Sequence, residues 1–289
     1  MLTALLLSLA LTQAAPASTT LDTAAIARAI GRQGQLQGDV YRIALPRTDL
    51  DVRVGDVKVR AGFALGSWVA FRGTSSGAIV DGDLVLTERE LDPVVARLFA
   101  SGLQITALHN HLVGETPRIM YLHVWGTGDA GKLAAGVRSA LDATATPLAA
   151  PAPPGAPPAD DAVPGADAIQ QRLGVKGAVR GGVLAMAVPR PEPITMMGSE
   201  LPPSMGMATS INVQADGKGG VVTTGDFVLT GDEVNPVAKA LSTNGIGVRA
   251  LHNHMIHGSP ELYFMHFWGS GAPDKIADGL KAALDAMKK

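Results

Sequence analysis

The sequence predicts an α+β protein of two tandem homologous repeats, each an antiparallel-rich sheet with two main helices packed on it. Three observations support this fold class. The two halves of the 289-residue chain align without a gap at an offset of 143 residues, as when Ala107 is placed on Ala250. Each half alternates short apolar strand-like segments with amphipathic helical segments. A stretch rich in Ala and Pro separates the halves.

The N-terminus and the Ala/Pro-rich stretch define the expected domain organisation. Residues 1–17 have the pattern of a signal peptide, since an apolar run precedes Ala15-Pro16-Ala17, an A-x-A cleavage site. Repeat 1 is then expected at 18–143, a linker at 144–165 and repeat 2 at 166–289. No apolar run is long enough for a membrane span. We therefore expect a soluble protein that is secreted or periplasmic.

Each repeat is expected to contain the same elements in the same order. Strands follow from alternating apolar residues, and helices from apolar residues at intervals of three and four. A helix is expected to begin at Pro93 behind an Asp92 cap and to end at Gly102. Repeat 1 should contain helices at 23–30, 93–101 and 131–143, and strands near 39–45, 66–71, 83–86, 104–111 and 119–125.

Composition excludes several classes of function. The chain has 24 basic and 26 acidic residues, so it lacks the basic surplus typical of nucleic-acid-binding proteins. It has no cysteine, which excludes disulfides, cysteine-ligated zinc, a thiol nucleophile and a lipid-anchored N-terminal cysteine. All seven histidines lie in two short windows, 109–123 and 252–266. Any chemistry is therefore expected in these windows.

Three histidines recur at matched positions in both repeats. His109 and His111 are two residues apart on a predicted strand, so their side chains share one face. If His109 lies opposite His123 on the next strand, all three imidazoles of repeat 1 converge. Three imidazoles with an open fourth position suit Zn, Cu or Fe(II). The predicted metal ligands are His109, His111, His123, His252, His254 and His266.

The two predicted sites differ in their additional groups. Glu115 in repeat 1 corresponds to Gly258, and the extra histidine His257 of repeat 2 corresponds to Gly114. Tyr121 corresponds to Phe264, so repeat 1 alone offers a phenol. Glu115 and Tyr121 are therefore the candidate catalytic residues, and His257 is a possible extra ligand. Whether the protein is an enzyme stays open.

Other patterns favour structural roles. Gly126 to Gly131 spells GxGxxG, but repeat 2 lacks the third glycine, and we interpret the segment as a turn with Thr127 or Ser270 capping the next helix. Thr87-x-x-Glu90 and its counterpart in repeat 2 fit capping boxes. Asp83 and Asp226 are interpreted as turn aspartates.

The string LHNH at 108–111, followed by Pro117 and by HxWGxG at 123–128, recurs in repeat 2 behind the apparent signal peptide. With an Ala/Leu-rich helix after it, this pattern resembles the LppY/LpqO family of secreted bacterial proteins. The resemblance covers residues 31–142 and 174–285 and implies duplication and export. It implies no particular reaction.

The favoured hypothesis is an exported soluble binding protein with a three-histidine metal or small-ligand site in each repeat. Its expected partners are a metal ion or a small molecule, and the repeats are expected to be able to pack as an intramolecular pseudo-dimer. One alternative is a metal-dependent enzyme, hydrolytic or oxidative, active in repeat 1. Another is a structural or interaction module whose histidines serve only the hairpin.

Overall fold

The computed structural model describes residues 20–149 and 162–287, which form two six-stranded antiparallel sheets with matching strand order. The sheet of repeat 1 contains, from edge to edge, β1 (Gln35–Gln37), β2 (Val40–Pro46), β5 (Gly66–Gly73), β6 (Ala78–Thr87), β9 (Ile119–Gly128) and β7 (Gln104–His109). That of repeat 2 contains β10 (Gly177–Arg180), β11 (Val183–Pro189), β14 (Ala208–Ala215), β15 (Val221–Leu229), β18 (Tyr263–Gly271) and β16 (Gly247–His252). The predicted fold class is confirmed.

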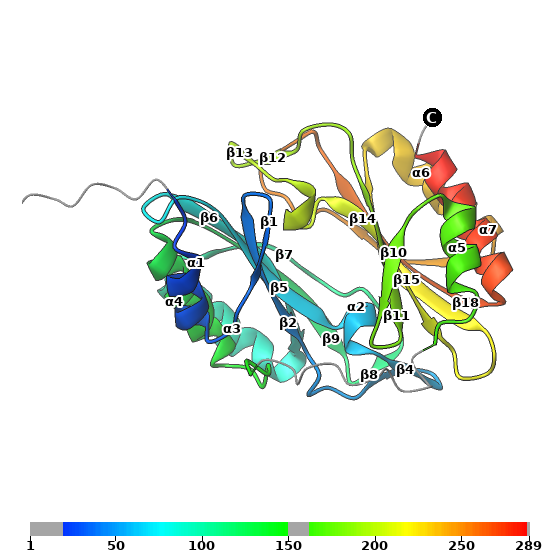
Figure 1. The fold of residues 1–289 in the computed structure, drawn as a ribbon, viewed down its shortest axis with the longest axis horizontal. Helices are drawn as coiled ribbons and strands as arrows, with labels where there is room; N and C mark the ends of the chain where they lie inside the picture. Colours follow the sequence, from blue (N-terminus) through cyan, green and yellow to red (C-terminus); the bar gives the residue numbers. More distant parts are fainter. Residues whose placement is uncertain (1–19, 150–161, 288–289) are drawn as a thin grey trace, which may run out of the picture.

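Helices cover one face of each sheet and lie at the two outer sides of the molecule (Figure 1). They are α1 (Thr23–Ile30), α3 (Glu88–Ala100) and α4 (Ala130–Leu141) in repeat 1, and α5 (Ala166–Leu173), α6 (Gly231–Thr243) and α7 (Pro273–Ala286) in repeat 2. In repeat 1, Ile43, Phe71 and Leu122 of the sheet pack with Val137 of α4 in a fully buried core. None of the described helices has the length and apolar character needed to cross a bilayer.

The other faces of the two sheets face each other, and each repeat sends a small extension across to its neighbour. The extension of repeat 1 comprises β3 (Val52–Val54), β4 (Val57–Val59), α2 (Ala61–Ala64) and β8 (Glu115–Thr116); that of repeat 2 comprises β12 (Thr195–Met196), β13 (Ser199–Glu200), η2 (Pro203–Met205) and β17 (Gly258–Ser259). Phe63 packs with Val183 and Val222, and Met205 packs with Val40. This reciprocal exchange buries residues of both repeats together in two shared apolar clusters.

The extensions also exchange hydrogen bonds with the opposite repeat. The Asn212 amide donates to the Phe63 carbonyl at 2.9 Å, and the Arg42 guanidinium donates to the Ser204 carbonyl at 2.7 Å. Buried backbone carbonyls that would otherwise lose water are therefore satisfied across the interface.

Two predicted helix starts are wrong. Helix α3 begins at Glu88 behind the capping box of Thr87 and Glu90, so Pro93 lies inside the helix. Pro93 is the sixth residue of α3, beyond the first turn where a missing N–H costs no hydrogen bond, so the capping box and not the proline sets the start of the helix. Helix α4 is capped by Asp129, whose side chain accepts from the Lys132 N–H at 2.9 Å, because β9 continues through the predicted cap Thr127.

The gap-free alignment of the repeats is also wrong in one segment. Asp83 and Asp226 are equivalent, yet Asp83 pairs with Trp68 and Asp226 with Ser210, which lie 142 residues apart. Repeat 2 is therefore one residue shorter before β12, and the turn position of Gly55 is taken by Met197, with a left-handed φ of 49°. The segment has little sequence identity to reveal the deletion.

The predicted signal peptide, residues 1–17, lies outside the described residues, as do residues 150–161 of the predicted linker. The ends of that linker pack against the repeats. The Arg32 guanidinium donates to the Pro147 carbonyl at 3.2 Å, and Val163 belongs to the core of repeat 2. Both flanks are thus part of the folded repeats.

Candidate metal centre

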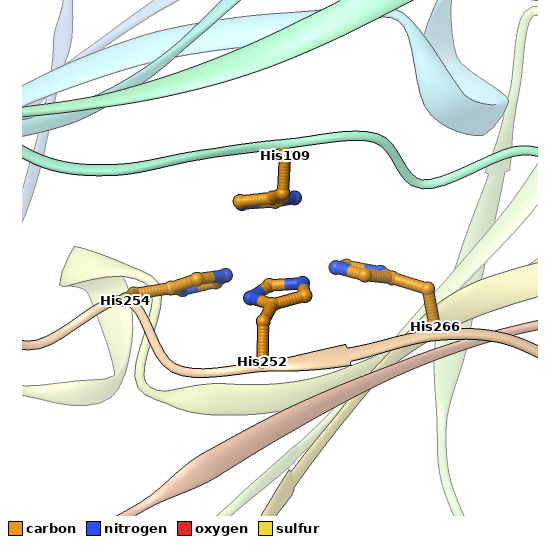
Figure 2. A group of neighbouring side chains, drawn as sticks. All are labelled: His109, His252, His254 and His266. Carbon is orange, nitrogen blue, oxygen red and sulfur yellow. The ribbon is translucent and has the colours of Figure 1, made fainter.

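The six matched histidines meet in one cluster between the two sheets. His109 and His252 end the edge strands β7 and β16, and His123 and His266 lie within β9 and β18. Figure 2 shows His109 of repeat 1 opposite His252, which His254 and His266 flank. The structure therefore joins in one place what the sequence suggested as two separate sites.

The register that brings the histidines of repeat 1 together differs from the prediction by two residues. Tyr121 pairs with His109, and His123 pairs with Ala107, while a β-bulge interrupts the pairing just beyond them, between Ile105 and Ala107. A shift of two residues keeps the same side chains on the same face, so His109 and His123 still converge. The strand ends at His109, because the following segment leaves to form β8, and His111 approaches the cluster from beyond the strand.

The imidazole rings form two nearly flat layers, one from each repeat. In repeat 1, the His109 ring centre lies 5.1 Å from those of His111 and His123, with interplanar angles of 16° and 25°. In repeat 2, the His252 ring centre lies 4.9 Å from those of His254 and His266, with angles of 28° and 24°. Each repeat therefore contributes three imidazoles at one level.

The two layers stack face to face. The ring centres are 3.7 Å apart for His109 and His252, 3.7 Å for His111 and His266, and 3.8 Å for His123 and His254. Exchanging the two repeats maps the first pair onto itself and interchanges the other two, as an approximate twofold axis requires. On the outer faces, Tyr121 stacks on His111 at 3.4 Å and Phe264 on His254 at 3.7 Å.

Many nitrogens in this cluster are buried without a hydrogen-bond partner among the described residues. They are eight in number: both ring nitrogens of His109 and His252, and Nε2 of His111, His123, His254 and His266. His266 Nδ1 is 3.0 Å from the Gly225 carbonyl, to which it donates in the tautomer that leaves Nε2 with a free lone pair. A hydrogen bond from the second ring nitrogen to a backbone carbonyl is typical of metal-bound histidine.

Burial keeps the imidazoles neutral. It lowers the pKa of His109 to about 3 and that of His252 to about 4, and it holds the pKa of the other four well below the usual value of an imidazole. The neighbouring His252 adds to the lowering of the His109 pKa, because two positive rings in contact would repel each other. Neutral rings are the form that binds a metal ion.

Two buried carboxylates adjoin the rings. The sequence suggested Asp83 and Asp226 as turn residues, but they lie inside β6 and β15, directly opposite His123 and His266. Asp83 Oδ1 is 3.9 Å from His123 Nε2, and Asp226 Oδ1 is 3.9 Å from His266 Nδ1. Burial raises the pKa of Asp83 to about 7. The turn interpretation failed because each β-strand extends farther than predicted.

A cavity of about 260 Å³ opens beside the cluster, between the repeats. Arg42 and the buried Asp81 line it together with the cluster, and the Arg42 guanidinium lies 3.8 Å above the centre of the Trp68 ring. Neither Arg42 nor Asp81 is among the site residues predicted from the sequence. The signal was available, since Asp81 and Asp83 are two apart in an apolar strand, a spacing that buries both on one face.

The remaining predicted site residues lie away from the ring nitrogens. The Glu115 carboxylate accepts from the Ile119 N–H at 3.4 Å, and the Tyr121 hydroxyl donates to the Ala64 carbonyl at 2.7 Å. His257 is exposed on the turn before β17, with a left-handed φ of 53°. Tyr121 thus contributes its ring face to the cluster, while its hydroxyl donates a hydrogen bond to the extension of repeat 1.

Comparison with solved structures gives weak likenesses. EtuB from Clostridium kluyveri is 10% identical, with 89% of this chain and 90% of that chain covered, and has a TM-score of 0.21. The trimeric bacterial microcompartment shell protein PduB is 12% identical, with 88% and 89% covered, and also has a TM-score of 0.21. No curated protein matches the sequence.

A family model matches the chain twice, over residues 24–143 and 167–286. These two segments contain both sheets and all six clustered histidines. The model is described as a domain of unknown function (DUF1259), and the family assignment to LppY/LpqO expected from the sequence is corrected accordingly. The chain belongs to the family of the domain of unknown function DUF1259, of which it carries two tandem copies.

Proposed function

We propose that the protein binds a transition metal at the six-histidine cluster between its repeats. The observation that carries this proposal is the set of eight buried imidazole nitrogens without a partner in the described part of the chain. A buried polar atom left unpaired costs about 1–3 kcal/mol, so eight in one place are a heavy penalty. A bound ion would remove much of it by accepting the free lone pairs.

The ligand chemistry defines the class of ion. Imidazole suits Zn, Cu and Fe, whereas Ca and Mg prefer oxygen ligands. One nitrogen each from His109, His252, His254 and His266 lies within 4.8 Å of the others. Two metal–nitrogen bonds span at most about 4.2 Å, so ligands drawn from this group need a contraction of roughly half an ångström. The cluster is therefore close to a binding geometry before any ion enters.

We also propose that the protein acts outside the cytoplasm. The support is the signal-peptide pattern of residues 1–17. Fractionation of the native host with an antibody against the mature chain tests this part independently. Recovery in the cytoplasm at full precursor mass would contradict it.

Elemental analysis of untagged protein from its native compartment tests metal binding. We expect at least one equivalent of Zn, Cu or Fe per chain, because the neutral imidazoles bind without first losing protons. Histidines that only support the fold would leave the protein metal-free. Less than about a tenth of an equivalent, with no uptake on titration, contradicts the proposal.

Paired variants assign the metal to the cluster. The double variant H109A/H252A removes the central stack, and we expect it to lose most of the bound metal and the associated rise in melting temperature. H257A is the matched control, since it removes an exposed histidine on the turn before β17 and should bind as the parent does. An equal loss of bound metal in both variants would show that the metal binds outside the six-histidine cluster.

A further inference from the structure

The two-layer arrangement of the rings bears on how many ions the cluster holds. We infer that it holds two copper ions, one in the plane of each histidine layer, facing each other across the approximate twofold axis. This inference rests on the proposed metal binding and adds its stoichiometry and the identity of the ion.

In each layer, the spacings from the central ring, His109 or His252, to its two neighbours are close to those of imidazoles that share one ion. A metal about 2.0 Å from a ring nitrogen lies about 3.2 Å from the ring centre, so three such rings have centres about 5.2–5.5 Å apart. The centres in repeat 1 are 5.1 Å apart for His109–His111 and for His109–His123. Those in repeat 2 are 4.9, 4.9 and 6.4 Å apart, with the widest between His254 and His266.

Stacking disfavours a single ion held by both layers. The lone pair of an imidazole nitrogen lies in the plane of its ring, so it points along its own layer. Because His109 stacks 3.7 Å from His252 at an interplanar angle of 24°, its lone pair does not point at the centre of the opposite layer.

One ion in each layer would place the two ions at a metal–metal distance that is common in proteins. The three stacks set the distance between the layers at 3.7–3.8 Å. Two-metal sites in proteins place their ions about 3.5–4 Å apart, so two ions fit without any movement of one repeat relative to the other. Tyr121 and Phe264 cover the outer faces over His111 and His254.

The surroundings favour copper over zinc. Zinc prefers four ligands in a tetrahedron, whereas three nitrogens in a flat layer suit Cu(I), which is stable with three ligands. The cavity beside the cluster is lined by four methionines, Met196, Met205, Met207 and Met255. Thioethers are soft ligands that select Cu(I). The methionines of the cavity and the histidine layers therefore favour the same ion.

Anaerobic titration of the full chain with Cu(I), against a chromophoric competitor, measures the stoichiometry. We expect two equivalents per chain and, in X-ray absorption of the loaded protein, nitrogen scattering near 2.0 Å with a copper–copper feature near 3.7 Å. The triple variant H252A/H254A/H266A removes one layer and should bind one equivalent without that feature. H257A is the control and should keep both.

The outcomes separate the two proposals. A single equivalent in the parent protein, or two equivalents without a copper–copper feature, overturns the paired site while leaving metal binding intact. Uptake of zinc but not of Cu(I) overturns the copper assignment. Failure to bind any transition metal overturns the proposed function itself. The absorption measurement on the parent protein needs no variant, so a misfolded triple variant does not leave the question open.

Discussion

Arg47 is a fully buried charge that ties three segments of repeat 1 together. Its guanidinium contacts the Asp49 and Glu90 carboxylates, each at 2.8 Å, and donates to the Val85 carbonyl at 2.6 Å. Arg190 makes the corresponding contacts in repeat 2. Because Nε, Nη1 and Nη2 of Arg47 all donate to oxygen atoms, its buried charge is compensated, and removing it would leave the partly buried Asp49 and Glu90 carboxylates and the Val85 carbonyl without this partner.

We therefore predict that R47A lowers the free energy of unfolding by about 3–5 kcal/mol, as expected for breaking a buried ion pair. The matched control is K58A, because the Lys58–Asp51 pair lies on the surface, where such pairs contribute about 1 kcal/mol or less. Urea unfolding of both variants checks the difference. Similar losses of unfolding free energy in the two variants would show that Arg47 does not tie the three segments together.

The neutral histidines make stability sensitive to acid. Their folded-state pKa values lie below the unfolded value of about 6.5, so the unfolded chain takes up more protons and stability falls as the pH drops below about 6.5. The raised pKa of Asp83, Asp81 and Asp226 acts in the opposite sense, since their folded forms hold protons that the unfolded chain has released above about pH 4. The loss of stability from six histidines exceeds the gain from three acids, so we expect the net stability to fall as the pH drops below about 6.5.

The melting temperature of chelator-treated protein should accordingly fall between pH 7 and pH 5. Replacing the central pair, as in H109Q/H252Q, should reduce the slope, whereas H257A should preserve it. A melting temperature that stays constant over this range would contradict burial of the six rings in their neutral form.

At the scale of elements, local signals predicted most of the fold. Apolar periodicity located α1 and α5 with the boundaries observed, and it gave the paired strands that carry the histidines. The failures arose where two local signals competed. Pro93 resembles a helix start, yet the capping box six residues earlier begins the helix. Register shifts and single-residue deletions depend on pairing partners, which no local pattern contains.

The first turn of α4 offers a test of one such competition. D129A should lower the free energy of unfolding by about 1 kcal/mol, because it removes the acceptor for the Lys132 N–H. T127A, at the cap expected from the sequence, should change it by no more than a few tenths, since Thr127 is exposed in β9. Thermal or urea unfolding distinguishes the two, and the reverse order would restore the sequence-based assignment.

At the scale of the whole molecule, the sequence identified the six histidines but not their common location. Matched positions in the two repeats show that each repeat has three histidines, and strand geometry explains why these three histidines converge. That the sets meet depends on how the extensions cross between repeats, through contacts such as Phe63 with Val183. Contacts this distant in sequence leave no periodic trace.

The crossed extensions predict that the halves stay together without a covalent link. If a protease site is introduced within residues 150–161 and cut, we expect the two fragments to co-elute from a gel-filtration column at micromolar concentration. The reason is the shared interior and hydrogen bonds such as Asn212 to Phe63. An uncut sample of the same variant is the control, and separate elution of the fragments would contradict the shared interior.

The approximate twofold axis through the histidine stacks has a consequence for how such a site is assembled. A chain with one repeat would need to meet a second copy, so the number of complete sites would depend on protein concentration. Joining two repeats replaces that encounter with an intramolecular one at high effective concentration. It also allows the halves to diverge, so that one half carries Arg42 and Asp81 at the positions where the other half carries Ala185 and Thr224, which identical subunits could not do.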